Sequence, residues 1–183
     1  FLGSSVRSNS AMSAYAQTKC FAETLTSVFR SQYRLPTMIA RPFAFVGPYQ
    51  RVDSPWAINN FVHDVLNGER IKVLGDGRTI RSYLYGSDVA FGLLSMLVHG
   101  EVGDTYNLGS DQEIDVKSLA HLVAEKAGVT TEIFLSNLST ESLQASRLVP
   151  DTTVAQEQLQ LNVSVPLEAA ISQTLEWNQL CKT

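Results

Sequence analysis

Tyr15 and Lys19 are the residues of this sequence whose types and spacing point most directly to chemistry. They lie four positions apart in the stretch SAYAQTK, ahead of a run with helical periodicity, so a helix would bring both side chains to one face. A free phenol has a pKa of about 10 and is a weak base at neutral pH, but a nearby ammonium stabilises the phenolate. Such a pair can take a proton from a hydroxyl while hydride leaves the same carbon for an oxidised nicotinamide. A surface Lys below a half-buried Tyr on any amphipathic helix has the same spacing, and this alternative stays open.

A nicotinamide cofactor also needs a glycine-rich turn for its pyrophosphate, and the sequence contains none. The 11 glycines are scattered, and neither G-x-G-x-x-G nor G-x-x-G-x-x-G occurs. The chain begins FLGSSVRSNS, with no initiator Met and no signal-peptide pattern. We therefore expect the chain to be a fragment of a longer protein.

Helical and strand-like patterns alternate along the chain. Helical periodicity predicts helices over residues 10–33, 56–66, 87–99, 115–127 and 166–180, and Asp115 is expected to cap the fourth of them. Short runs of strand formers predict strands over residues 37–46, on both sides of the Gly-Asp-Gly turn within 70–85, and over 104–109. Residues 130–150 show no clear pattern. This alternation is typical of an α/β or mixed α+β fold.

Composition and charge exclude several classes of partner. The net charge is −4 with a pI near 5.3, and no cluster of Lys and Arg occurs, so we expect no nucleic-acid partner. The longest apolar run, near Val89–Val98, is too short to span a bilayer, so we expect no membrane insertion. Cys20 and Cys181 are expected to be reduced thiols of a cytoplasmic protein. The three histidines have no metal-ligand spacing, so we expect no metal site.

Five motifs in a fixed order carry a family resemblance. The segments SAYAQTKCFAE, IARPFAFVGP, IKVLGDGRTIRSYLYGSDVA, YNLGSDQEIDVKSLA and LEWNQL resemble the extended short-chain dehydrogenase/reductase family, and within it the NAD-dependent sugar-nucleotide epimerases and dehydratases. The resemblance is strong over residues 9–128 and weaker elsewhere. In that family the glycine-rich turn, the first strands and a catalytic Ser or Thr precede the YxxxK helix, so this chain resembles the C-terminal half.

The resemblance implies an α/β fold divided between two domains. Residues 1–46 and 87–110 would be the C-terminal part of a Rossmann-like NAD-binding domain. Residues 47–86 and 111–183 would form a smaller mixed α/β substrate-binding domain. Full-length members of the family are expected to be homodimers.

The same resemblance implies roles for individual residues. Tyr15 would be the catalytic acid/base, and Lys19 would bind the nicotinamide ribose and favour the phenolate. Pro42 and Phe43 would lie beside the nicotinamide, because ligands bind at the carboxyl ends of strands in such sheets. Arg81 would bind the diphosphate of the sugar nucleotide, since a guanidinium suits phosphate oxygens.

Other assignments stay open or depart from the family pattern. Val73 and Leu74 could flank the nucleotide base or simply be strand core. Arg81 could instead form a surface ion pair with Asp76 or Asp88, and we expect Asp88 to cap a helix rather than bind a ligand. The chain also has Ala and Val where the family often has a substrate-contacting Asn and the Tyr of its Y-G-P motif, and the early serines Ser4 and Ser5 are left without a role.

The implied function is oxidation of a nucleoside-diphosphate sugar by NAD or NADP through a 4-keto intermediate, as in an epimerase or dehydratase. The chain alone is expected to be inactive, because the pyrophosphate-binding part of the site is missing. Alternatives are a dehydrogenase or ketoreductase of the same family and a non-catalytic sugar-nucleotide-binding module. The sequence does not distinguish among these reactions, nor does it identify the sugar or the nucleotide.

Overall fold

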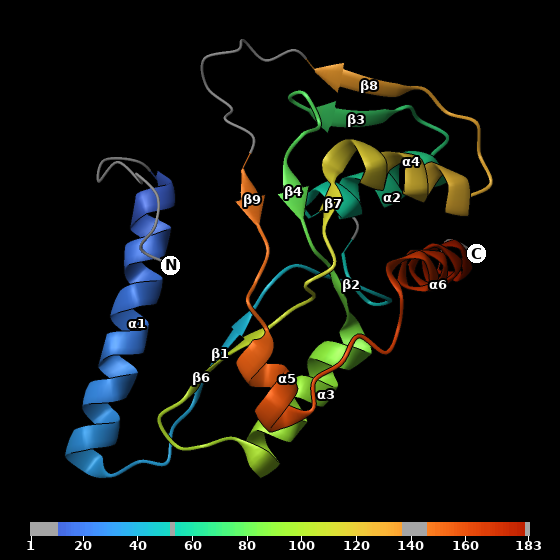
Figure 1. Ribbon diagram of the computed structural model, residues 1–183. Coiled ribbons are helices and arrows are strands. Elements are labelled where there is room, and N and C mark those ends of the chain that lie inside the picture. Colours follow the sequence, from blue (N-terminus) through green and yellow to red (C-terminus); the bar gives the residue numbers. More distant parts are fainter. Residues whose placement is uncertain (1–10, 52–53, 137–145, 182–183) are drawn as a thin grey trace. The chain divides into compact units, whose positions relative to one another are not determined.

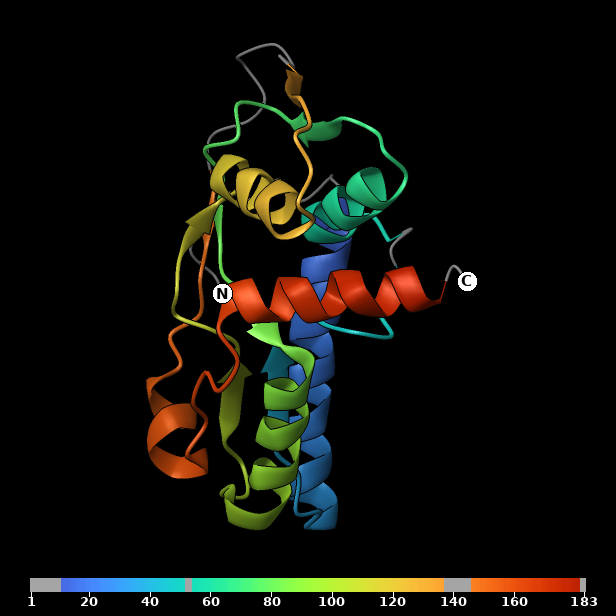
Figure 2. The ribbon, with the colours of Figure 1, turned by 90° about the vertical axis from the view of Figure 1, so that its right-hand side faces the viewer.

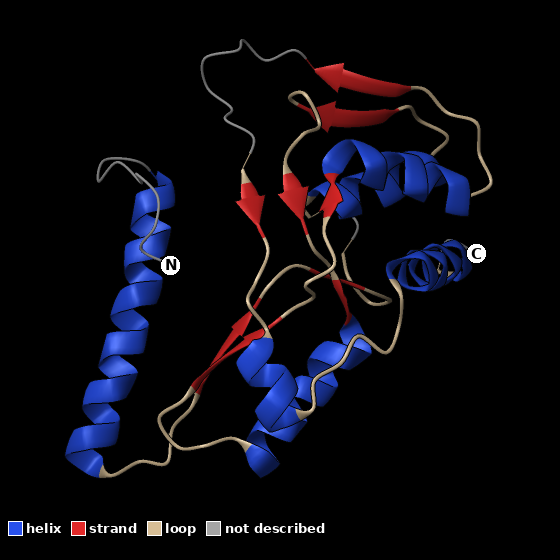
Figure 3. Ribbon diagram, in the orientation of Figure 1, coloured by secondary structure: helices blue, strands red, loops and turns tan. Residues whose placement is uncertain are grey.

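The computed structural model describes residues 11–51, 54–136 and 146–181, with side chains from Ser13 onward. The mixed α/β class expected from the sequence is confirmed, because helices and short strands alternate through the described ranges (Figure 1, Figure 3). The chain divides into two compact units: residues 1–39 with 100–105, and residues 40–99 with 106–183.

The first unit is dominated by helix α1 (Ala11–Tyr33), which matches the helix predicted over residues 10–33. It ends where Arg34 takes a left-handed backbone conformation with φ 53°, two residues before Pro36. The chain then meets residues 100–105, and the N–H of Gly103 donates to the carbonyl of Thr37. Several large apolar side chains of α1 are 40–65% exposed, namely Tyr15, Phe21, Leu25, Val28, Phe29 and Tyr33.

The strand predicted over residues 37–46 is two strands in different sheets, so that prediction was wrong in detail. Strand β1 (Ile39–Pro42) pairs with β6 (Thr105–Leu108). Strand β2 (Phe45–Val46) pairs in parallel with β5 (Leu84–Tyr85).

The change of partner takes place at residues 43 and 44. The N–H of Phe43 still donates to the carbonyl of Leu108, whereas the carbonyl of Ala44 accepts from the N–H of Leu84. An uninterrupted apolar run cannot reveal such a switch, because each half alone has the composition of a buried strand. The break places Pro42 and Phe43 at the point where the chain leaves one sheet for another.

Two further sheets hold the remaining strands of the second unit. Strand β3 (Ile71–Leu74) pairs in parallel with β8 (Ile133–Ser136). Strand β4 (Ile80–Arg81) lies between β7 (Ile114–Asp115), to which it is antiparallel, and β9 (Arg147–Leu148), to which it is parallel. The sequence did not predict β7, β8 or β9.

The Gly-Asp-Gly turn joins these two sheets. Gly75 and Gly77 have φ values of 85° and 78°, a left-handed conformation that glycine adopts without a Cβ penalty. A Cβ on Gly77 would also come within 2.7 Å of the Cβ of Lys117. The predicted turn with strands on both sides is therefore confirmed, but β3 and β4 do not pair with each other.

The described part of the second unit contains five helices. α2 (Ala57–Leu66), α4 (Val116–Lys126) and α6 (Leu167–Leu180) pack against one another, with β3 beside α2 and α4 (Figure 2). α3 (Gly86–His99) packs with α5 (Thr153–Leu159). The best-buried members of the main core cluster are Val46, Ile58, Phe61, Val62, Ile71, Val73, Leu119, Ala120, Val123, Ala170 and Ile171.

Asp88 does not cap a helix, contrary to the sequence-based expectation. Helix α3 begins at Gly86, so Asp88 lies inside the first turn and is only 3% exposed. Its Oδ2 atom accepts the backbone N–H groups of Ser164 at 2.9 Å and Val165 at 3.2 Å. The carboxylate therefore ties the segment before α6 to the start of α3.

Asp115 is the N-cap of α4, as the sequence predicted. Its Oδ1 accepts the backbone N–H of Ser118 at 2.8 Å, and its Oδ2 accepts the Ser118 hydroxyl at 2.6 Å. These two hydrogen bonds lower the pKa of Asp115 below its ordinary value of 3.8, and the bond from the Ser118 hydroxyl has the larger effect. A depressed folded-state pKa means that the carboxylate stabilises the fold fully above pH 3.8, and that this contribution is lost as the pH falls through the lower folded value.

We therefore predict that Asp115→Ala lowers the free energy of unfolding by about 1 kcal/mol at pH 7, the usual value of an N-cap. The difference from the unchanged chain should shrink below about pH 4, where the cap carboxylate becomes protonated. Urea unfolding at pH 7 and pH 3 measures both effects. Asp111→Ala is the matched control, because it removes an exposed carboxylate four residues earlier. An equal loss in the two variants would contradict the cap.

Candidate functional site

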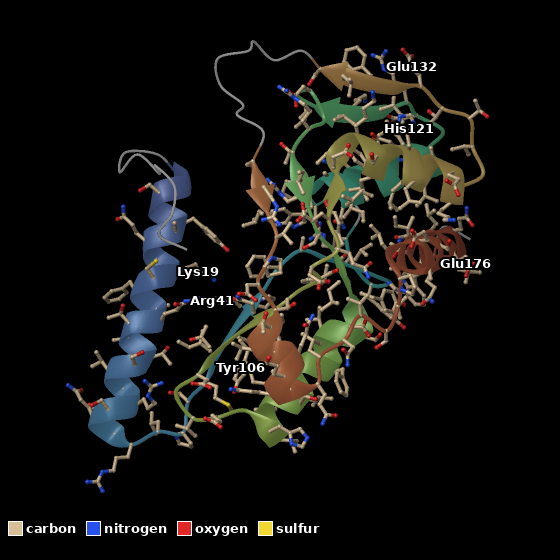
Figure 4. All side chains as sticks on the ribbon, viewed as in Figure 1. Lys19, Arg41, Tyr106, His121, Glu132 and Glu176 are labelled. Carbon is tan, nitrogen blue, oxygen red and sulfur yellow. The ribbon has the colours of Figure 1, made fainter. Side chains whose placement is uncertain are left out.

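Tyr15 and Lys19 lie on the same face of α1, as their spacing predicted. The Nζ atom of Lys19 is 5.6 Å from the centroid of the Tyr15 ring, within range of a cation–π contact. Tyr15 is 64% exposed and Lys19 is also exposed, and Lys19 projects from the helix in Figure 4. Within the described residues neither side chain makes a hydrogen bond or an ion pair. The phenol and the ammonium are therefore both available to a ligand.

Pro42 and Phe43 follow directly at the end of β1. Pro42 is exposed and Phe43 is partly buried. The Phe43 side chain packs close to Gly109, because a Cβ at residue 109 would lie 3.0 Å from the Cβ of Phe43 and 2.7 Å from the Cγ of Pro150. Gly109 thus allows the close approach that positions Phe43. This role was not predicted, although a glycine within a predicted strand, here its last residue, often marks a close backbone approach.

Val73 and Leu74 point to opposite sides of β3, as alternate residues of a strand must. Val73 is fully buried in the core cluster, and Leu74 is 74% exposed. The sequence left two interpretations open for this pair, and the burial of Val73 matches the interpretation as strand core. A contact with a nucleotide base stays a prediction for Leu74 alone.

Arg81 is held by backbone and hydroxyl groups. Its Nη1 donates to the carbonyls of Ile80 at 2.7 Å and Ser146 at 3.1 Å, and its Nη2 donates to the hydroxyl of Ser146 at 3.0 Å. Ser146, which lies 65 residues further along the chain, was not predicted as a partner of Arg81.

The ion pairs considered for Arg81 in the sequence analysis are not formed. Asp76 binds the Nε of Arg78 at 2.6 Å, and Asp88 accepts backbone N–H groups. Burial raises the pKa of the nearby Tyr83 to about 12, although the positive charge of Arg81 opposes this shift, so the Tyr83 phenol is neutral at neutral pH. Among the described residues Arg81 therefore has no counter-ion.

Tyr15 and Lys19 belong to the first compact unit, and Pro42, Phe43 and Arg81 belong to the second. The second unit also contains a small space among buried side chains and an open surface hollow, and none of the predicted site residues lines either one. The first lies between the β2 loop, α2 and α6 and is lined by Val46, Gln50, Ile58, Asn59, Val62 and Thr174. The second lies beside the Gly-Asp-Gly turn and the start of α4, and Ile80 of β4 lines it. Because neighbouring residues of a strand point to opposite sides, Arg81 lies on the other side of β4.

The described part of the chain contains no group of three or more His, Cys, Asp or Glu side chains placed to hold a metal ion. None of its helices combines the length and the apolar character needed to cross a bilayer. Cys20 and Cys181 are both free and exposed.

The fold is mixed α/β with a tyrosine and a lysine paired on one helix, and sequence comparison identifies the family. The chain belongs to the NAD dependent epimerase/dehydratase family, whose model matches residues 4–109. The family resemblance seen in the sequence motifs is thereby confirmed.

Known relatives include several sugar-nucleotide enzymes. The chain is 31% identical to UDP-glucuronic acid decarboxylase 1 of Xenopus tropicalis over 163 residues, which cover 89% of this chain and 38% of the relative. It is 29% identical to the dTDP-D-glucose 4,6-dehydratase of Mus musculus over 168 residues, which cover 89% of this chain and 46% of the relative.

Solved structures show the same fold. The chain matches a UDP-glucose 4-epimerase from Thermotoga maritima, crystallised with UDP-glucose, with a TM-score of 0.84 and 25% identity over 92% of this chain and 54% of that one. The chain thus spans less than half the length of these curated relatives and about half of the solved epimerase.

Proposed function

We propose that this chain provides the catalytic and sugar-binding part of an NAD-dependent epimerase or dehydratase that acts on a nucleoside-diphosphate sugar through a 4-keto intermediate. The observation that supports this function best is the Tyr15–Lys19 pair, in which the ammonium lies 5.6 Å from the centroid of the phenol ring and neither group has a hydrogen-bond partner among the described residues. Family membership and sugar-nucleotide enzymes among the relatives point the same way.

The residues of α1 suit a nicotinamide cofactor. NAD, or NADP in the alternative case, supplies a hydride acceptor when it is bound. Tyr15 would remove the proton from the sugar hydroxyl, and Lys19 would stabilise the phenolate by its charge. The three N–H donors of Lys19 also suit the diol of a ribose. No glycine-rich turn occurs in this sequence, so contacts to the pyrophosphate would come from residues outside it.

The second unit would bind the sugar nucleotide. We propose that Arg81 binds the diphosphate, that Pro42 and Phe43 border the nicotinamide, and that Leu74 contacts the base. On this assignment residues 1–46 and 87–110 belong to the cofactor domain, and residues 47–86 and 111–183 belong to the substrate domain. A partly buried guanidinium without a counter-ion in the described chain is what an anionic ligand requires.

Two wider features belong to the same proposal. The exposed apolar side chains of α1 favour a homodimer of the full-length protein, since an exposed apolar patch commonly marks an interface. The free thiols of Cys20 and Cys181 suit a reducing compartment such as the cytoplasm.

A second candidate is a sugar-nucleotide-binding module without catalysis. The Arg81 guanidinium supports it, because a cation with no counter-ion among the described residues suits a diphosphate whether or not hydride transfer takes place. The two candidates differ in one measurable property: an enzyme binds NAD and turns over, whereas the module binds only the sugar nucleotide.

Replacing Arg81 tests the proposal. In the protein expressed from its complete gene, Arg81→Gln should weaken binding of UDP-glucose or dTDP-glucose by about 10- to 100-fold, because hydrogen bonds to a charged group are lost. Isothermal titration calorimetry measures the affinity. Arg78→Gln is the matched control, since it removes an exposed arginine three residues away that is already paired with Asp76. Failure of the unchanged protein to bind either sugar nucleotide, or an equal loss in both variants, would refute the function.

A further inference from the structure

The hydrogen bonds of the Arg81 guanidinium leave one of its edges unused. A guanidinium carries five N–H donors in a fixed plane: one on Nε, two on Nη1 and two on Nη2. The two Nη1 donors are bound by the carbonyls of Ile80 and Ser146, and one Nη2 donor is bound by the Ser146 hydroxyl. The Nε donor and the second Nη2 donor have no partner among the described residues.

These two remaining donors form a fork. The carbonyl and the hydroxyl of Ser146 together occupy the outer end of the guanidinium, between Nη1 and Nη2. The unused N–H of Nη2 then points parallel to the N–H of Nε along the side of the group. Two parallel N–H groups in this arrangement match two oxygens of one phosphate or carboxylate.

The position of Ser146 is fixed by the sheet. Its carbonyl accepts the backbone N–H of Ile80 at 2.9 Å, in the parallel register that pairs Ile80 with Arg147. The side chain of Arg147 in turn forms an ion pair with Glu113, and this pair raises the pKa of Arg147 and lowers that of Glu113. Ser146 therefore presents its two oxygens from the position just before β9, a strand that is held by its pairing with β4 and by the Arg147–Glu113 ion pair.

We propose that Ser146 is the positioning residue for Arg81: it occupies the end of the guanidinium and leaves the Nε–Nη2 side free for two oxygens of the diphosphate of a nucleoside-diphosphate sugar. Ser146 acts through Arg81 and does not itself contact the phosphate. This inference rests on the proposed function of Arg81 as the diphosphate ligand.

The test uses UDP as the probe and the protein expressed from its complete gene. Ser146→Ala should weaken UDP binding about five- to tenfold, because the guanidinium loses one of the bonds that fix its orientation. Ser146→Thr keeps the hydroxyl and should restore the affinity to within about twofold. Ser172→Ala is the matched control, since it removes a serine hydroxyl that bonds only within α6.

A double substitution separates positioning from a general structural effect. In an Arg81→Gln background, Ser146→Ala should have no further effect on UDP affinity, because the group that it positions is gone. The ¹⁵N NMR signal of the Arg81 Nε–H should shift when UDP binds to the unchanged protein, and should broaden in Ser146→Ala as the guanidinium rotates.

The outcomes distinguish this inference from the function on which it rests. If the unchanged protein does not bind UDP, both the positioning role of Ser146 and the proposed function of Arg81 are overturned. A protein that binds UDP equally well with and without the Ser146 hydroxyl overturns only the positioning role. An equal loss of affinity in the Arg81 and Arg81→Gln backgrounds also overturns the positioning role, since Ser146 would then act independently of Arg81.

Discussion

Tyr15→Phe is expected to lower kcat by about a thousandfold or more in the protein expressed from its complete gene, while the affinity for NAD stays within about twofold. The variant keeps the aromatic ring beneath the Lys19 ammonium and removes only the hydroxyl. Because the lost atom is the proposed proton acceptor, the deficit should appear in the chemical step. Steady-state kinetics with UDP-glucose and fluorescence titration with NAD measure the two quantities.

Tyr33→Phe provides the matched control for this substitution. Tyr33 ends the same helix and is 63% exposed, against 64% for Tyr15. Its hydroxyl should be dispensable, so kcat should stay within about twofold of the unchanged value. Retained turnover in Tyr15→Phe, together with a loss of NAD affinity, would assign Tyr15 to cofactor binding and reject the proton-transfer role.

The largest loss of stability is expected from Phe61→Ala, at about 3–5 kcal/mol in the free energy of unfolding. Phe61 lies in α2, is 1% exposed and belongs to the main core cluster. Truncating its ring removes buried apolar surface and leaves a cavity among close-packed neighbours. For a domain with a total stability of about 5–15 kcal/mol, this loss is a large fraction. Urea denaturation of the 183-residue chain followed by circular dichroism measures it.

Phe91→Ala is the corresponding control. Phe91 is also a helical phenylalanine, but it is 50% exposed on α3. Its truncation should cost about 1 kcal/mol or less, since the side chain loses few buried contacts. Equal midpoints for the two variants would mean that the cluster around Phe61 is not the core of the second unit.

The helices were the most predictable part of the fold. The periodic run that became α1 begins within one residue of its predicted start and ends at its predicted residue, Tyr33. Helix α4 was predicted together with its cap, because Asp115 stands directly before an apolar stripe and bonds locally to Ser118. Both signals depend on residues a few positions apart, which is the range that a single sequence displays directly.

The strands were less predictable, because a strand is defined by a partner elsewhere in the chain. Residues 37–46 contain two strands that a local pattern cannot separate, since their partners are β6 and β5. The two-residue strands β7 and β9 are too short for any alternation to be visible. Only the pairing itself distinguishes them from loops.

The residues of the candidate site show the same difference between local patterns, which could be predicted, and long-range pairing, which could not. Tyr15 and Lys19 could be predicted from spacing, and the structure places them on one face. The burial of Val73 against the exposure of Leu74 could not be predicted, because the strand pattern does not say which side of β3 meets the helices. Ser146 could not be found at all, since its contact with Arg81 arises from the parallel register of β4 and β9.

The parallel pairings of the second unit also have a consequence for how fast it forms. The contacts Gly75–Ser136, Arg81–Ser146 and Asp88–Ser164 close loops of 61, 65 and 76 residues. The entropy of closing such loops is lost before the contacts stabilise the chain, so folding dominated by them is slow. During that delay the edges of β3 and β4 stay unpaired, and unpaired strand edges promote association between chains. The time spent with open edges, more than the final stability, should therefore limit how concentrated a refolding solution of this chain can be.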